Sequence, residues 1–69
     1  MKISARNVIK GKVNKVTACM VNDEVIIEIP GGDEIVSVIT KSSVEKLGVA
    51  PGKEVYAIIK ATNVMIGTD

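Results

Sequence analysis

Valine and isoleucine account for 21 of the 69 residues of this chain, whereas leucine occurs only once. Both residue types branch at Cβ, which restricts the first side-chain torsion and makes them pack better on a pleated sheet than along a helix. The composition therefore predicts a mostly β protein.

The length of the chain limits how stable it can be by itself. We assign residues 1–69 to a single domain, because this length leaves no room for a second core. A domain of this size buries only about 60% of the surface that its unfolded chain exposes. The one cysteine, Cys19, cannot form an internal disulfide. We therefore expect a partner subunit or a ligand to supply the missing stabilisation.

The first half of the chain reads as three strands. A strand is expected at residues 7–16, and Gly11 within it suggests a bend or bulge because it has no side chain to pack. After a turn at 17–22, apolar and polar residues alternate over 24–29. The sequence Pro30-Gly31-Gly32-Asp33 then predicts a hairpin whose return strand covers 34–39.

The second half predicts one short helix and two more strands. Residues 40–48 have helical spacing, with a Ser42/Glu45 capping box at the start and Gly48 as the C-terminal stop. Pro51-Gly52 is typical of a type II turn, and strands are expected at 55–60 and 63–67. The order βββαββ suits a small five-stranded barrel of the oligonucleotide/oligosaccharide-binding (OB) kind with one short helix.

Several function classes are disfavoured by what the sequence lacks. There is no histidine and only one cysteine, which leaves out nearly every zinc site and every Ser-His or Cys-His catalytic arrangement. No general base has a recognisable partner, so an enzyme is the least favoured interpretation. No run is long and apolar enough to cross a bilayer and no signal peptide opens the chain, so we expect a cytoplasmic protein.

A single-stranded nucleic-acid-binding OB-like module is the main alternative, because this architecture often binds single strands. The formal net charge is only +1, with nine basic and eight acidic residues interspersed. Tyr56 is the only aromatic residue on which a base could stack. Both features count against this alternative. A structural or regulatory module of the kind found in a longer transporter or transcription factor is a third interpretation.

The two ends of the chain carry similar motifs, Ser4-Ala5-Arg6-Asn7-Val8 and Lys60-Ala61-Thr62-Asn63-Val64. We call these the end motifs. Each offers one cation, one hydroxyl and a small alanine that allows close approach to the backbone, which together suit an anion. If the fold brings the ends together, the end motifs would form one anion-binding surface.

A second anion signal lies at the start of the predicted helix, where Thr40, Ser42 and Ser43 cluster. Hydroxyls and free backbone N–H groups at such a position favour a negative ligand, although serine and threonine there are more often caps than ligands. Lys41, Lys46 and Lys53 are expected to be ordinary surface charges.

The predicted strands carry more apolar residues than one buried face needs, which indicates self-association. The run 55–59 is apolar at successive positions, and Ile26 interrupts the polar row of its strand. Such side chains would point away from the core as well as into it, and a second copy of the chain would cover them.

These residues together resemble a molbindin, a small molybdate-binding protein of the Mop type. The resemblance covers nearly the whole chain and rests on Ile3-Ser4-Ala5-Arg6-Asn7, on residues 38–48, and on residues 52–66 with Lys60-Ala61. It implies a cytoplasmic homohexamer, a trimer of dimers, that holds molybdate or tungstate between subunits and serves intracellular molybdenum storage or homeostasis. It implies no cofactor and no free metal cation.

The resemblance also implies a set of site residues. One subunit would supply six residues, and a neighbour would supply Thr40 and Ser43. A second kind of pocket is assigned to the loop 17–22. The six residues are Ser4, Ala5, Arg6, Lys60, Ala61 and Thr62, and the loop residues are Cys19, Met20 and Val21.

Overall fold

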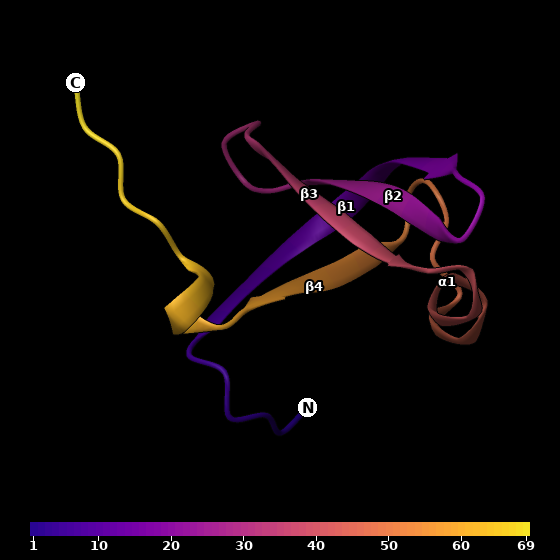
Figure 1. Cartoon of the computed structure of the whole chain (residues 1–69), viewed down its shortest axis with the longest axis horizontal. Helices are drawn as coiled ribbons and strands as arrows, with labels where there is room; N and C mark the ends of the chain where they lie inside the picture. Colours follow the sequence, from indigo (N-terminus) through magenta and orange to yellow (C-terminus); the bar gives the residue numbers. More distant parts are fainter.

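The computed structural model describes all 69 residues of the chain. The fold is one antiparallel sheet with a short helix at one end (Figure 1). No helix has both the length and the apolar character needed to cross a bilayer. The mostly β character with one short helix is confirmed. In chain order the elements are β1 (Asn7–Ala18), β2 (Asn22–Glu28), β3 (Glu34–Thr40), α1 (Lys41–Leu47), β4 (Glu54–Ile59) and a 3-10 turn, η1 (Ala61–Asn63).

The long strand β1 holds the sheet together. The strand order is β3-β2-β1-β4, and all neighbours are antiparallel. The first half of β1 pairs with β4, from Asn7 opposite Ile59 to Lys12. The second half pairs with β2, from Lys12 to Ala18 opposite Asp23. Because each half has a different neighbour, the sheet curls about β1 into a half-barrel whose free edges are β3 and β4.

The turns form where the glycine pattern predicts them. Gly31 and Gly32 adopt φ angles of 100° and 94° in the connection between β2 and β3. Gly52 has φ 92° in a turn closed by the N–H of Lys53, which donates to the carbonyl of Ala50 at 3.1 Å. These angles suit glycine, since only a residue without Cβ adopts them freely. The predicted hairpin and the type II turn are confirmed.

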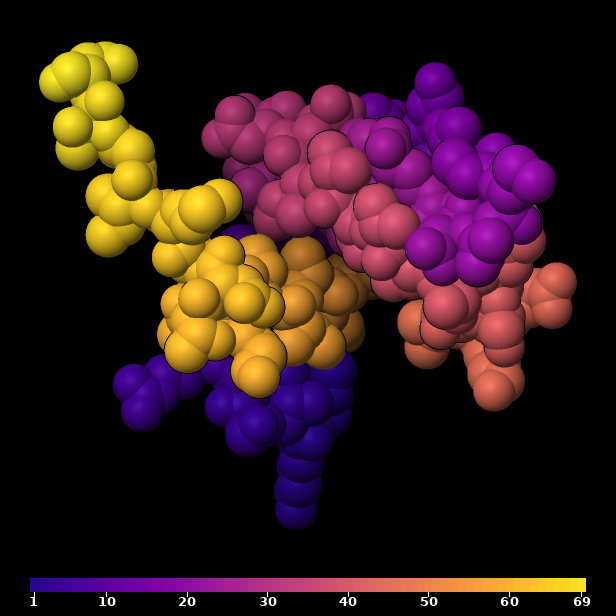
Figure 2. All heavy atoms as spheres, viewed as in Figure 1, coloured from indigo at the N-terminus to yellow at the C-terminus, as the bar shows by residue number.

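The predicted fifth strand at residues 63–67 is wrong for the isolated chain. After β4 the chain enters η1, where the N–H of Asn63 donates to the carbonyl of Lys60 at 2.9 Å. It then runs away from the sheet (Figure 1), and Figure 2 shows these last residues projecting from the body of the molecule. Met65 and Ile66 are each 92% exposed. A strand needs a neighbouring backbone, and this turn directs the segment away from both free edges, so the five-stranded barrel is a four-stranded half-barrel here.

Gly11 lies where β1 changes neighbours, and the β-bulge predicted there occurs instead at Asn14, where the β1–β2 register shifts. A Cβ placed on Gly11 would lie 2.7 Å from the carbonyl oxygen of Glu28 and 2.7 Å from Cγ2 of Ile27. Only glycine allows β2 to approach this closely.

The core lies on the concave side of the half-barrel and is small. Four apolar residues are buried, and Val13, at the middle of β1, is 1% exposed. Half-buried side chains from β3, β4 and the helix end surround them. The four buried residues are Val13, Val25, Ile27 and Ala57.

The half-barrel leaves apolar surface open. Tyr56 and Ile58 of β4 are exposed while Ala57 between them is buried, so the predicted apolar character of both faces of β4 is confirmed. Val36 and Val38 of β3 are also exposed. A cleft of about 300 Å³ lies between β3 and β4, and a cavity of about 350 Å³ opens on the concave side. A single chain therefore does not fill its own interior.

Replacing Gly11 by alanine tests the close approach of β2. We expect Gly11→Ala to lower the free energy of unfolding by about 1–3 kcal/mol, because the new Cβ overlaps the backbone of β2. The measurement is urea unfolding at equal protein concentration. Gly67→Ala is the matched control, since a Cβ there meets no atom within 4 Å. Equal stabilities of the two variants would contradict the packing described for Gly11.

Candidate functional site

The two end motifs lie side by side. β1 begins at Asn7 opposite Ile59, where β4 ends, so Arg6 and Lys60 occupy the next positions at the same end of the sheet. Lys60 leads directly into η1, whose first residue is Ala61. The antiparallel register of β1 and β4 therefore brings Arg6 and Lys60 to the same end of the sheet, whereas the two termini diverge from there (Figure 1).

The charges of Arg6 and Lys60 are not neutralised within the chain. Both side chains are exposed, and both ion pairs of the structure involve other lysines. No aspartate or glutamate occurs in residues 1–8 or 60–66. The hydroxyls of Ser4 and Thr62 are also exposed and form no hydrogen bond within the chain. This end of the sheet thus offers cations and hydroxyl donors with no competing acid, which is the chemistry of an oxyanion site.

The hydroxyls of Thr40 and Ser43 form a compact pair at the start of α1. The N–H of Ser43 donates to Oγ1 of Thr40 at 3.1 Å, and the hydroxyl of Thr40 donates to Oγ of Ser43 at 2.9 Å. Thr40 is therefore the N-cap, and the predicted Ser42/Glu45 capping box is wrong. Threonine and serine are both good N-cap residues, but β3 continues to Thr40 and the helix begins at Lys41, so Ser42 already lies inside the helix.

The Thr40–Ser43 pair and the end motifs lie at opposite ends of the sheet (Figure 1). Thr40 pairs with Asn22 beside the last residue of β1, whereas Arg6 precedes the first. The 12 residues of β1 separate them, in a molecule that extends 34 Å along its longest axis. Within one chain these two groups cannot contact the same small ion.

The loop between β1 and β2 lies at the same end as Thr40. Cys19, Met20 and Val21 are all exposed, and the N–H of Cys19 donates to the carbonyl of Asn22 at 3.2 Å. The Cys19 thiol lies 3.9 Å from the carbonyl of Thr17, the distance of a weak hydrogen bond. The loop therefore stands apart from the end motifs of its own chain.

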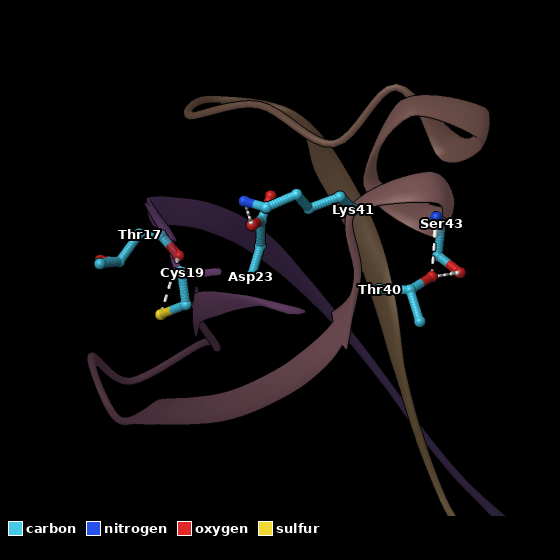
Figure 3. A network of polar contacts seen from close by, with 6 residues as sticks. All are labelled: Thr17, Cys19, Asp23, Thr40, Lys41 and Ser43. Carbon is cyan, nitrogen blue, oxygen red and sulfur yellow. Dashed lines mark hydrogen bonds and ion pairs between the residues drawn. The ribbon is translucent and has the colours of Figure 1, made fainter. Parts of the chain in front are cut away.

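An ion pair beside this loop was missed by the sequence analysis. Nζ of Lys41 donates to Oδ1 of Asp23 at 2.7 Å (Figure 3). Asp23 is the only buried charged residue, at 7% exposed. The prediction that Lys41 is an ordinary surface charge is wrong. Asp23 is in phase with the buried Val25 and Ile27, and this alternation is the signal that could have revealed an inward carboxylate.

Lysines along β1 face carboxylates on neighbouring strands. Lys10 lies 3.1 Å from Glu54, and the hydrogen bond to this carboxylate, with its charge, raises the pKa of Lys10 above its usual value. Lys12 pairs with Glu54 on β4 and with Glu28 on β2. Alternating charges of this kind do not form the broad basic surface that a nucleic-acid backbone needs.

Comparison with known proteins identifies the family of this chain. The TOBE domain family model matches residues 3–66. Molybdenum-pterin-binding protein 3 of Clostridium pasteurianum is 53% identical over 66 residues, which are 96% of this chain and 97% of the relative. The chain belongs to the Mop-type TOBE-domain family, the molbindins.

Solved structures of this family have the same fold. MopII from Clostridium pasteurianum superposes with a TM-score of 0.92 at 49% identity, over 97% of this chain and all of that chain. ModG, described as a cytoplasmic molybdate-binding protein with molybdate bound, gives a TM-score of 0.95 at 42% identity. The whole of this molbindin chain matches 49% of ModG.

The corrected N-cap generates a stability prediction for this Mop-type chain. We expect Thr40→Ala to cost about 1 kcal/mol, because the N–H of Ser43 loses its hydroxyl acceptor. Ser42→Ala is the control, since the Ser42 side chain makes no hydrogen bond and alanine suits a helix interior. Thermal or urea unfolding of both variants measures the difference. A larger loss with Ser42→Ala would restore Ser42 as the cap.

Proposed function

We propose that this protein binds molybdate, and also tungstate, in pockets between subunits of a homo-oligomer for intracellular molybdenum storage and homeostasis. The observation that carries the proposal is the pair of unneutralised cations, Arg6 and Lys60, held at one end of the sheet by the β1–β4 register. The binding named for the relatives and for ModG supports the choice of ligand.

The residues of the end motifs suit a tetrahedral dianion. Molybdate is fully deprotonated near neutral pH, so it accepts hydrogen bonds and donates none. Arg6, Lys60, the hydroxyls of Ser4 and Thr62 and the backbone N–H groups beside Ala5 and Ala61 supply donors, and no carboxylate occurs among these residues. Phosphate carries a proton at this pH, and the end motifs contain no carboxylate to accept it. Sulfate has the same charge but is smaller, so fixed donors set for the larger ion would discriminate against it.

The second half of the pocket is proposed to come from a neighbouring subunit. Thr40 and Ser43 lie at the far end of the sheet from Arg6 and Lys60, so they can join the same ion only across an interface. Their mutual hydrogen bond of 2.9 Å holds the two hydroxyls close together. Binding and assembly would then be coupled, because the ligand stabilises only the associated state.

The exposed apolar surface supports a homo-oligomer, for which we propose a hexamer built as a trimer of dimers. The cleft between β3 and β4 is lined almost entirely by apolar side chains, and the tail beyond η1 exposes Met65 and Ile66. Monomeric proteins seldom leave contiguous apolar surface of this kind uncovered. The loop residues Cys19, Met20 and Val21 are proposed to line a second kind of oxyanion pocket within this assembly.

The proposed role is that of a cytoplasmic binding protein rather than an enzyme. Two of the proteins compared are named as binding proteins, the molybdenum-pterin-binding protein 3 and ModG. No group of three or more His, Cys, Asp or Glu side chains is placed to hold a metal cation, so molybdenum would be bound as its oxyanion. The single-strand-binding alternative is less favoured, because β1 lysines face carboxylates and Tyr56 is the only aromatic side chain.

Replacing either basic residue tests whether Arg6 and Lys60 bind molybdate. We expect Arg6→Ala and Lys60→Ala each to weaken molybdate binding by about tenfold to a hundredfold, since each removes a charge-assisted hydrogen bond. Calorimetric titration gives the affinity, and circular dichroism checks the fold. Lys15→Ala removes the same charge from an exposed position with no ion pair and should bind like the wild type. Unchanged affinity in both site variants would remove this site assignment.

The oligomeric state is tested by size. We expect light scattering at micromolar concentration to give the mass of an assembly of several chains, because a single chain buries only four apolar residues. Truncation after residue 63 removes the exposed apolar tail and should shift the mass downward. A monomeric mass for the full chain would contradict a pocket between subunits. The Arg6 and Lys60 variants test molybdate binding independently of this result.

A further inference from the structure

Asp23 occupies a position where a carboxylate is costly. It lies on the inward row of β2 with Val25 and Ile27 and is 7% exposed. A buried carboxylate needs a counter-charge, and Lys41 supplies it through a bond of 2.7 Å. The buried carboxylate of Asp23 therefore holds the Lys41 ammonium in this ion pair.

The direction of this contact matters for the residues beside it. Lys41 directly follows Thr40 in the chain, and a free lysine side chain at this place could reach the Thr40 and Ser43 hydroxyls. Figure 3 shows that the Lys41 side chain instead runs toward Asp23, whereas the hydroxyls of Thr40 and Ser43 lie on the other side of the chain. Asp23 draws the cation away from the hydroxyl pair.

We propose that Asp23 is a specificity-determining residue that keeps the Lys41 ammonium out of the oxyanion pocket. The proposal rests on the proposed function, in which Thr40 and Ser43 complete that pocket. The two hydroxyls are fixed by the hydrogen bond between them and by the N–H of Ser43, which donates to Oγ1 of Thr40, so they can select an ion by size. An ammonium on a flexible stem acts as a point charge that adapts to any anion. Sequestering it therefore favours the larger ion over smaller dianions.

The variant Asp23→Asn tests this role. Releasing Lys41 should tighten both sulfate and molybdate binding by about two- to tenfold, the range expected for one partly exposed charge near a dianion. Sulfate should gain more, because the mobile cation can follow the smaller ion, so the ratio of the two affinities should fall. The gain should shrink when salt is added. Calorimetric titrations with both anions, at two salt concentrations, measure these changes.

Two matched variants separate local from general effects. Glu54→Gln removes one negative charge and frees Lys10 on β1, so it changes the net charge equally but away from Thr40. We expect it to leave the affinity ratio unchanged. Combining Asp23→Asn with Lys41→Met removes the released cation and should return both affinities to near the wild-type values. Lys41→Met alone leaves Asp23 unpaired and should weaken molybdate binding more than Lys46→Met, which removes an exposed lysine with no ion pair.

Specific results would overturn the proposal. If Asp23→Asn weakens both anions, Asp23 only supports the fold; if Glu54→Gln changes the ratio equally, net charge is responsible. A double variant that binds more weakly than wild type would make Lys41 a direct ligand. If Asp23→Asn does not fold, equal molybdate affinities of Lys41→Met and Lys46→Met reject the proposal. A wild-type protein that does not bind molybdate would reject the proposed function as well, whereas normal wild-type binding with an unchanged ratio rejects only the role of Asp23.

Discussion

The pairing of β1 with two different strands in succession determines the rest of this structure. Its first half takes β4 as neighbour and its second half takes β2. The exchange occurs at Lys12, which pairs with both strands, next to Gly11, where β2 approaches too closely for any side chain. This one register places Arg6 and Lys60 at one end of the sheet, and places the start of α1 and the β1–β2 loop at the other.

The same geometry leaves the half-barrel open and its apolar core only partly filled. A sheet that curls about a single strand makes a half-barrel, and four buried apolar residues cannot fill it. The residual apolar surface and the two separated groups of hydroxyl and basic side chains support the same proposal, association of several copies. Under that proposal the interface that buries Tyr56 and Ile58 also assembles the pocket, so a small domain gains stability from its cargo.

Local signals in the sequence predicted the local structure well. The β-branched composition, the glycine pairs and the alternation of β2 led to correct strands and turns, because each depends on backbone preferences of nearby residues. The errors occurred where contacts between residues distant in sequence determine the local structure. The N-cap is Thr40 because β3 stays paired up to Thr40, opposite Asn22. Residues 63–67 form no strand because η1 directs them away from the free edges of the sheet (Figure 1). Lys41 had an unforeseen partner because Asp23 comes from another strand.

The sequence by itself determined the chemistry of this protein: donors without acids in the end motifs, no histidine, a β-branched core, and the family to which these patterns point. Only the tertiary structure decided how that chemistry is distributed. Antiparallel pairing places Arg6 and Lys60 at the same end of the sheet, the length of β1 separates them from Thr40, and the buried Asp23 forms an ion pair with Lys41. Residue types determine which side chains can bind an anion. The arrangement of the strands determines which of these side chains can contact the same anion.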